Sequence, residues 1–138
     1  MADITVTAAK VAPVFPEKAE IFDMIAAEAI TKGQAVYQTT AGKAGVADAN
    51  ASGKQQFRGI ALNAAAAGAA VSVLKKGHLS GFTLSGNYDS AAYLSDTAGA
   101  LADAAGTMSV LCGRVMALTD KDLTKVLYVD ADWLRAWS

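Results

Sequence analysis

The sequence is poor in the residues that build disulfides, metal centres and nucleophilic active sites. Its 138 residues include one cysteine, one histidine and two prolines. A single cysteine cannot form an internal disulfide, so we expect a reducing compartment. Zinc ligand sets that need several Cys and His side chains are excluded. A hydroxyl nucleophile normally needs a base within reach, and the one imidazole, His78, lies in a Lys-Lys-Gly-His segment typical of a solvated turn.

Motifs for catalysis and cofactor binding are also missing. Neither G-x-G-x-x-G nor G-x-x-x-x-G-K-[ST], the two glycine-rich phosphate-binding motifs, occurs in the chain. Cys112 lies in an apolar segment, between Leu111 and Gly113, where cysteine behaves as a small buried hydrophobic residue. The sequence therefore predicts no enzyme activity, no cofactor and no metal site.

Charge and long apolar runs are scarce as well. Charged residues make up 18% of the chain, below the roughly 25% of an average soluble protein. The net charge of −1 provides no concentrated positive surface for nucleic acid. No apolar run approaches the roughly 18 residues of a membrane helix, and the Met-Ala-Asp start lacks the features of a signal peptide. We expect neither nucleic acid nor membrane as partner; the low charge instead indicates a surface that faces another protein.

Alanine is what the sequence has in excess. Hydrophobic residues make up 53% of the chain, but 31 of them are alanine. Such a composition builds a thin core of small side chains. The length fits one domain.

Glycines at short intervals divide residues 20–118 into apolar runs of strand length. Val71-Ser72-Val73-Leu74 shows the period-2 alternation of a half-buried strand. Short strands separated by frequent turn signals predict an all-β fold, a compact small β-barrel or sandwich. The runs that we expect to form strands are 34–38, 56–62, 70–74, 79–84, 109–118 and 126–129.

Two alanine-rich segments could instead be helical. Ala64–Ala67 has high helix propensity, but Asn63 and Gly68 bracket a stretch too short for a stable helix, which favours a tight connection. Asp23–Ile30 reads as strand or turn, with a helix as the alternative.

A weak internal repeat supports β structure. Ala35–Lys43 is echoed by Ala91–Ala100, and each segment is followed by a second apolar run, Arg58–Leu62 or Gly113–Leu118. We interpret each copy as a strand, a glycine-bearing hairpin turn and a returning strand. The copies are either an old duplication or two hairpins with the same geometry.

Both ends of the chain differ from the middle. Residues 1–19 are interpreted as an extended N-terminal arm, separate from a single β domain at 20–138, because Pro13 and Pro16 favour extended backbone. A disordered tail is the alternative. Near the other end lie Trp133 and Trp137, whose large indoles must be covered by this domain or by a partner.

The order of several short segments resembles a known family. These segments are Ala29–Tyr37, Gly59–Gly68, Val71–Leu74, Tyr93–Leu101 and Gly113–Met116. Together they are similar to the capsid cement, or decoration, proteins of tailed bacteriophages, over roughly residues 20–134. Each motif is loose by itself, because it consists of glycines and small apolar residues, and no catalytic residue can be carried over.

The resemblance implies a structural role in a larger assembly. It implies a homo-oligomer, a trimer before a dimer, that binds the major capsid protein on the outer surface of the virion, after synthesis in the bacterial cytoplasm. From the sequence we expect the arm to become ordered only on the capsid, by joining the edge of a neighbouring sheet. The side chains predicted to face the capsid or a neighbouring subunit are Ile4, Val6, Val11, Val14, Phe15, Trp133 and Trp137.

Two other functions remain open at this point. Ala26–Val36 is also similar to a turn-and-strand element of small β-clip (SAF-like) domains, which bind carbohydrate. A component of the phage tail or baseplate shares the same β architecture.

Overall fold

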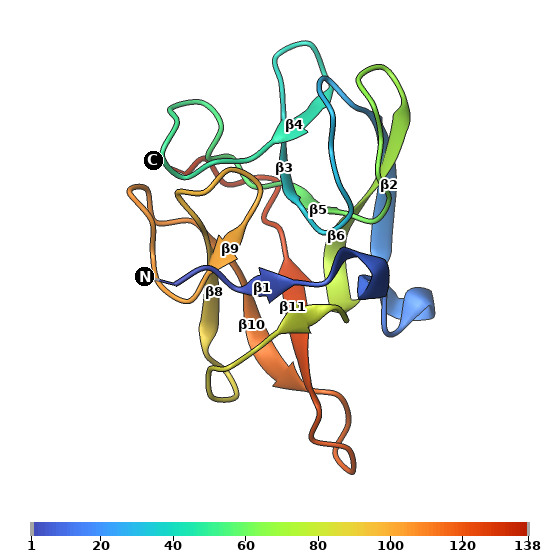
Figure 1. The fold of residues 1–138 in the computed structure, drawn as a ribbon, viewed down its shortest axis with the longest axis vertical. Coiled ribbons are helices and arrows are strands. Elements are labelled where there is room, and N and C mark those ends of the chain that lie inside the picture. The colour runs from blue at the N-terminus through green and yellow to red at the C-terminus, as the bar shows by residue number, and fades with distance from the viewer. Residues whose placement is uncertain (1, 138) are drawn as a thin grey trace.

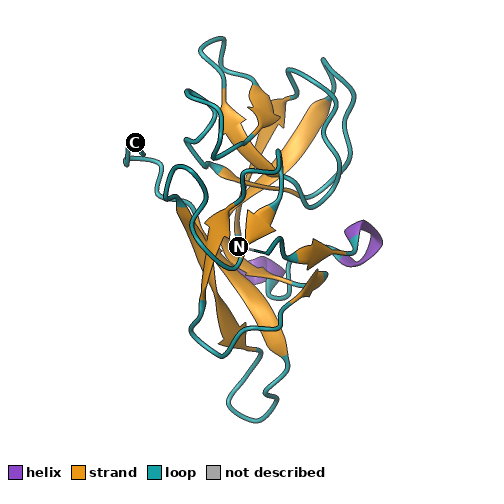
Figure 2. Ribbon diagram, turned by 60° about the vertical axis from the view of Figure 1, so that its left-hand side comes forward, coloured by secondary structure: helices purple, strands orange, loops and turns teal. Residues whose placement is uncertain are grey.

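The structure, a computed structural model, describes residues 2–137 and is all-β, as the sequence predicts. Two 3-10 turns, η1 (Ala8–Lys10) and η2 (Pro16–Lys18), are the helical elements of this part of the chain (Figure 2). At three residues each, they are far too short to cross a membrane. The strands are β1 (Thr5–Val6), β2 (Glu20–Ile25), β3 (Ala35–Gln38), β4 (Ala44–Val46), β5 (Gly59–Ala61), β6 (Ala70–Leu79), β7 (Phe82–Thr83), β8 (Ala91–Leu94), β9 (Leu101–Ala102), β10 (Leu111–Ala117) and β11 (Lys125–Asp130).

The two alanine-rich segments are not helical. Ala64–Ala67 forms a tight connection, in which Ala65 bridges Ile30. The segment 23–30 finishes strand β2 at Ile25 and then bends. Both outcomes agree with the preferred interpretation of the sequence.

The two copies of the weak repeat form the same arrangement of strands. In the first copy β3 pairs with β4 and β5, and β5 pairs with β6. In the second copy β8 pairs with β9 and β10, and β10 pairs with β11. The main path through the sheet is β4-β3-β5-β6-β11-β10-β8-β9, so the two copies meet where β6 pairs with β11. In Figure 1 the first copy forms the upper part of the molecule and the second the lower part.

The long strand β6 is shared by both halves. Its residue Lys76 pairs with Glu20 of β2 and with Asp130 of β11, and Leu74 pairs with Ile21 of β2 and Ile60 of β5. A strand residue has one neighbour on each side, so β2 lies along one side of β6, and β5 and β11 share the other side.

The upper half is an almost closed barrel. Its strands run β2-β6-β5-β3-β4, and a single parallel bridge between Ala26 and Ala44 connects β4 back to the chain that follows β2. Small residues fill its core: Ala26, Ile30, Val36, Ala44, Ala61, Ala65, Val71 and Val73. A second, larger buried cluster occupies the rest of the molecule around Phe57, Leu74, Leu79, Leu94 and Leu127.

The N-terminal arm packs on its own chain, which corrects the expectation that it is ordered only by a partner. Val11 is fully buried in the larger core. The Ile4 N–H donates to Leu101 O (2.8 Å), and the Val14 N–H donates to His78 O (2.9 Å). Apolar burial and backbone pairing with three strands, β6, β7 and β9, hold the arm in place. The sequence pattern did not reveal these partners because they lie some 65 to 100 positions further along the chain.

Candidate interaction surface

Strand β2 carries large apolar side chains on both of its faces. Its neighbours across the pairing with β6 are Val73 for Phe22 and Val71 for Met24, both on the barrel side. Ile21 and Ile25 alternate with them and lie on the outer face. Ile21, Phe22 and Ile25 remain 40%, 42% and 45% exposed, so neither face of the strand is covered.

Trp133 extends this apolar surface from the other end of the chain. Its ring centroid lies 4.8 Å from that of Phe22, and its indole N–H donates to Arg58 O (2.8 Å). The Lys75 ammonium lies 5.1 Å from the same ring, in cation–π contact. With 37% of its surface exposed, Trp133 is fixed in orientation but accessible. We call the group Ile21, Phe22, Met24, Ile25 and Trp133 the β2 surface.

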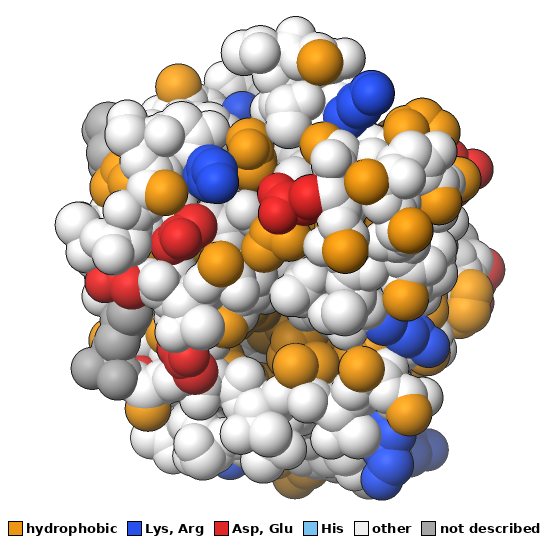
Figure 3. All heavy atoms as spheres, turned by 45° about the horizontal axis from the view of Figure 1, so that its top comes forward, with side chains coloured by type: hydrophobic (Ala, Val, Ile, Leu, Met, Phe, Trp, Pro, Cys, Tyr) orange, Lys and Arg blue, Asp and Glu red, His pale blue; other side chains and the backbone are white. Residues whose placement is uncertain are grey.

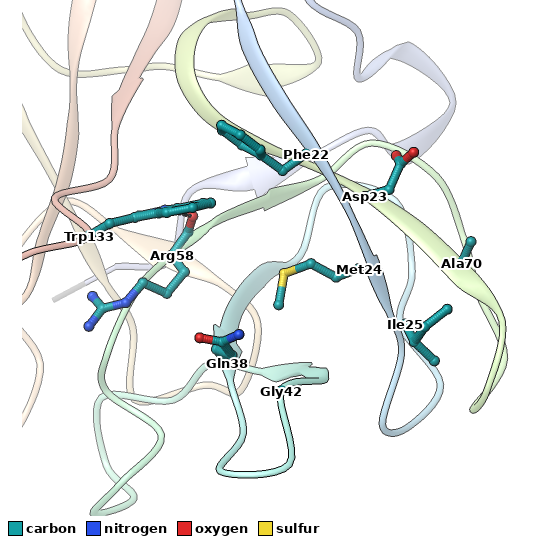
Figure 4. A pocket seen from close by; sticks show the side chains of 9 residues that line it. All are labelled: Phe22, Asp23, Met24, Ile25, Gln38, Gly42, Arg58, Ala70 and Trp133. Atoms are coloured by element: carbon teal, nitrogen blue, oxygen red, sulfur yellow. Dashed lines mark hydrogen bonds between the residues drawn. The ribbon is translucent and has the colours of Figure 1, made fainter.

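A cleft of about 500 Å³ opens between β2 and the β3–β4 hairpin. Met24 points into it, and Phe22 and Trp133 converge at one end, while Asp23 and Ile25 project from the opposite side of the strand (Figure 4). Gln38 of the hairpin provides a polar side chain across the cleft. The volume falls within the range of ligand-binding clefts.

Arg58 anchors the wall of the cleft. Its guanidinium donates to the backbone oxygens of Phe57 (3.1 Å), Asp132 (3.3 Å) and Arg135 (3.2 Å). Burial lowers the pKa of Arg58, and the Asp132 carboxylate partly offsets this. Through these bonds Arg58 connects the wall of the cleft to the C-terminal segment.

The C-terminal segment is locked by two glutamines. The backbone carbonyl of Trp137 accepts from the side-chain amides of Gln55 (3.0 Å) and Gln56 (2.7 Å). The backbone N–H of Trp137 donates to Gln56 Oε1 (2.7 Å). Trp137 is only 9% exposed and belongs to the larger core. Of the two predicted tryptophans, Trp133 is therefore on the surface and Trp137 is a core residue.

The predicted arm residues do not join the β2 surface. Val11 is buried, and Ile4, Val14 and Phe15 are half-buried. The Phe15 ring packs edge-on against His78 at 5.3 Å. Val6, 40% exposed in β1, is the most accessible of the five. The structure thus separates the arm from Trp133, and it removes Val11 from the residues that could face a partner.

The structure places His78 within strand β6, which corrects the solvated turn predicted there, and it places Cys112 within strand β10. His78 lies between the rings of Phe15 and Tyr128, and burial, followed by the nearby Lys18 ammonium, lowers its pKa. Cys112 is buried, and burial raises the pKa of its thiol well above the usual range. Within residues 2–137, no three His, Cys, Asp or Glu side chains converge to hold a metal ion.

Sequence reasoning missed the main part of this surface. The run Ile21-Phe22-Asp23-Met24-Ile25 has four large apolar residues in five positions, which by itself indicates a buried strand. Only the topology shows that β2 is an edge strand, which pairs with β6 and with no other strand among residues 2–137. Figure 3 shows apolar side chains recurring over the top of the molecule, with charged groups scattered between them.

Comparison of the chain with family models, with curated proteins and with solved structures gives no match.

Proposed function

We propose that this protein is a capsid cement protein, which binds the outer surface of an assembled phage shell and stabilises it. The observation that carries the proposal is the β2 surface, where Ile21, Phe22, Ile25 and Trp133 leave apolar area exposed around an edge strand. Exposed apolar patches of this kind mark sites of protein association. The resemblance of the sequence to decoration proteins supplies the identity of the partner.

The physical role follows from mass action. A protein that binds only the assembled shell lowers the free energy of that state relative to free capsid subunits. A homo-oligomer, a trimer in this proposal, engages several capsid subunits at once, so a modest area per copy is sufficient. The major capsid protein is the partner, and the outer face of the virion is the location.

Co-sedimentation with shells tests the proposal directly. The purified chain is mixed with expanded, undecorated capsids and, separately, with tails of the same phage. We expect saturable binding to capsids and none to tails. Binding to tails alone would assign the protein to the tail or baseplate instead.

A matched pair of variants tests whether the β2 surface is used. Phe22→Ser removes an exposed aromatic ring, and truncating such an anchor typically costs 2 kcal/mol or more, so we expect Kd for shells to rise at least about tenfold. Leu123→Ser is the control, because Leu123 is 61% exposed and lies in the β10–β11 hairpin, outside the β2 surface. Both variants are first checked by sedimentation to have the mass of the unmodified protein, so that a change in self-association is not counted as a loss of capsid binding. Equal affinity of both variants would exclude the β2 surface.

Carbohydrate binding is the second candidate, favoured by the composition of the cleft. Phe22, Trp133 and Gln38 combine aromatic surface with a hydrogen-bonding amide, which is the usual make-up of a small-ligand site. A monomer in solution whose melting temperature rises with added sugars, and which does not bind shells, would support this function in place of the first.

A further inference from the structure

The edge of β2 has backbone donors without partners. In β6, the Ser72 carbonyl accepts from Leu62 N–H (2.8 Å) and the Ser72 N–H donates to Asn63 Oδ1 (2.7 Å). The backbone N–H and C=O of Ser72 are therefore directed toward β5. Backbone groups alternate along a strand. The backbone groups of Val71 and Val73 are therefore directed toward β2, where they form hydrogen-bonded pairs with Met24 and Phe22.

The backbone N–H groups of the alternate residues of β2 must then be directed away from β6. This set comprises Ile21, Asp23 and Ile25, and none of their N–H groups has an acceptor among residues 2–137. Ala27 is the next residue in this alternation, and its N–H donates to Ala44 O of β4 (2.7 Å). The N–H groups of Ile21, Asp23 and Ile25 are therefore directed to the same side of β2 as β4. Three consecutive outward donors thus line the open side of the barrel, beside the cleft.

Other edges of the sheet are covered by the chain itself. Asp3 bridges Ala102 of the terminal strand β9, and Ile4 N–H donates to Leu101 O. At the opposite end, β4 is met by Ala27 and by the Glu28 carboxylate, which accepts from Val46 N–H (3.2 Å). Native proteins protect edge strands in such ways, or with charged side chains, most often lysine, and with proline. The charged residues of β2 are Glu20 and Asp23, and the strand contains no lysine or proline.

The charge of β2 indicates the chemistry of its partner. The strand carries the carboxylates of Glu20 and Asp23 and no cation. Lys75 lies 3.8 Å from Glu20, whereas Asp23 accepts only a neutral hydrogen bond from the Ser72 hydroxyl (2.9 Å). Pairing with β2 of a second copy would bring four carboxylates onto one short ladder, which is unfavourable. The charge pattern therefore favours a different chain that carries a lysine or arginine.

We propose that the β2 edge receives an extended segment of the capsid protein as an added strand. The segment pairs with the outward N–H groups of Ile21, Asp23 and Ile25, and places alternate apolar side chains in the cleft against Phe22 and Met24. Its basic side chain pairs with Asp23. Main-chain pairing with pockets for alternate side chains is the physical basis of strand addition. This proposal rests on the function proposed above.

Hydrogen exchange on the unmodified protein tests the pairing. Amides of Ile21, Asp23 and Ile25 are open in the free protein, so we expect fast exchange in solution and at least tenfold slower exchange on capsids. Bound protein that exchanges these amides as fast as free protein overturns the strand addition, while the cement function stands. Protection that appears with rising protein concentration and without capsids would assign the edge to a second copy.

A pair of substitutions at one position tests the same donors by affinity. Asp23→Pro and Asp23→Ala both remove the carboxylate and its bond to Ser72, but only proline removes the outward N–H. Proline is tolerated on an edge strand where its missing N–H faces away from the ladder. We expect Asp23→Pro to bind capsids at least tenfold more weakly than Asp23→Ala, with both variants still folded by circular dichroism.

Equal affinity of the two folded variants overturns the proposal. If Asp23→Pro does not fold, the exchange measurement on the unmodified protein decides alone. Failure of the unmodified chain to bind capsids refutes the cement function itself, and the strand addition with it.

Discussion

At the residue scale, close backbone approach decides which glycines are essential. Gly113 in β10 lies opposite Val129 of β11 and is buried. A Cβ atom at this position would lie 2.1 Å from Tyr128 O, part of the neighbouring backbone. Backbone cannot move aside as a flexible side chain can, so the two strands would have to separate.

We therefore predict that Gly113→Ala destabilises the fold. Overpacking of a tight site typically costs 1–3 kcal/mol, and we expect a loss in this range or above it in the free energy of unfolding. Gly86→Ala is the control, because its Cβ would meet only the Ser90 side chain at 3.2 Å, and it should change stability by less than about 0.5 kcal/mol. Urea unfolding of both variants measures the difference; similar values would contradict the prediction.

The surroundings of some single residues could also be predicted from the sequence. Burial of Cys112 follows from its apolar neighbours, and the structure confirms it. The sequence alone could not tell which of Trp133 and Trp137 is buried. Both follow β11, and their burial depends on contacts with residues far away in the sequence. Gln55, Gln56 and Arg58, about 80 positions earlier, determine that outcome.

At the scale of elements, the arm is attached through the aromatic cluster around His78. The imidazole lies between Phe15 of the arm and Tyr128 of β11, at centroid distances of 5.3 and 5.0 Å. The charged group that faces it is the Lys18 ammonium, from η2. A proton on the half-buried His78 would therefore lose part of its solvation and would face a second positive charge.

We predict that acidification loosens the arm. Because the pKa of His78 is lowered in the folded state, the unfolded chain binds this proton more readily. The contribution of His78 to stability is thus complete above about pH 6.5, the value for an unperturbed imidazole, and decreases as pH falls toward the lower native pKa. The melting temperature should fall more between pH 7.5 and pH 5 for the unmodified protein than for His78→Phe, which cannot titrate. An equal fall in both would contradict this role.

Several strand boundaries followed from local signals, but strand neighbours did not. The predicted break between residues 74 and 79 is wrong, because β6 runs unbroken from Ala70 to Leu79. Alternation and glycine positions predicted the strands around Ala35–Gln38 and Leu111–Ala117, and the structure confirms them. The edge position of β2 depends on which strands fail to lie beside it. No local pattern carries that information, so the β2 surface emerged only from the topology.

At the scale of the whole molecule, large apolar side chains are exposed at more than one place. The exposed large hydrophobic side chains of residues 2–137 also include Tyr88, Met116 and Leu123, far from β2 along the chain, and Leu134, which is 100% exposed next to Trp133. Two separated apolar areas are what a protein needs if one contacts the shell and another contacts copies of itself.

We predict that the protein self-associates in solution. Sedimentation equilibrium should give a mass near three times the 14.1 kDa of one chain. Met116→Ser should weaken the association, because Met116 belongs to the second apolar area, whereas Trp133 belongs to the β2 surface, which faces the shell in the function proposed above. A monomer at every accessible concentration would contradict the trimer, and it would leave capsid binding to single copies.

The pairing of the arm with late strands has a consequence for how the chain is made. Asp3 and Ile4 bond to residues 101 and 102, and Val14 bonds to residue 78. At a synthesis rate of about 5–20 residues per second, the ribosome needs roughly 5–20 s to produce the partners of Asp3 and Ile4. The arm therefore leaves the ribosome well before these partners are made, and its pairing with β9 can form only after residue 102 has emerged.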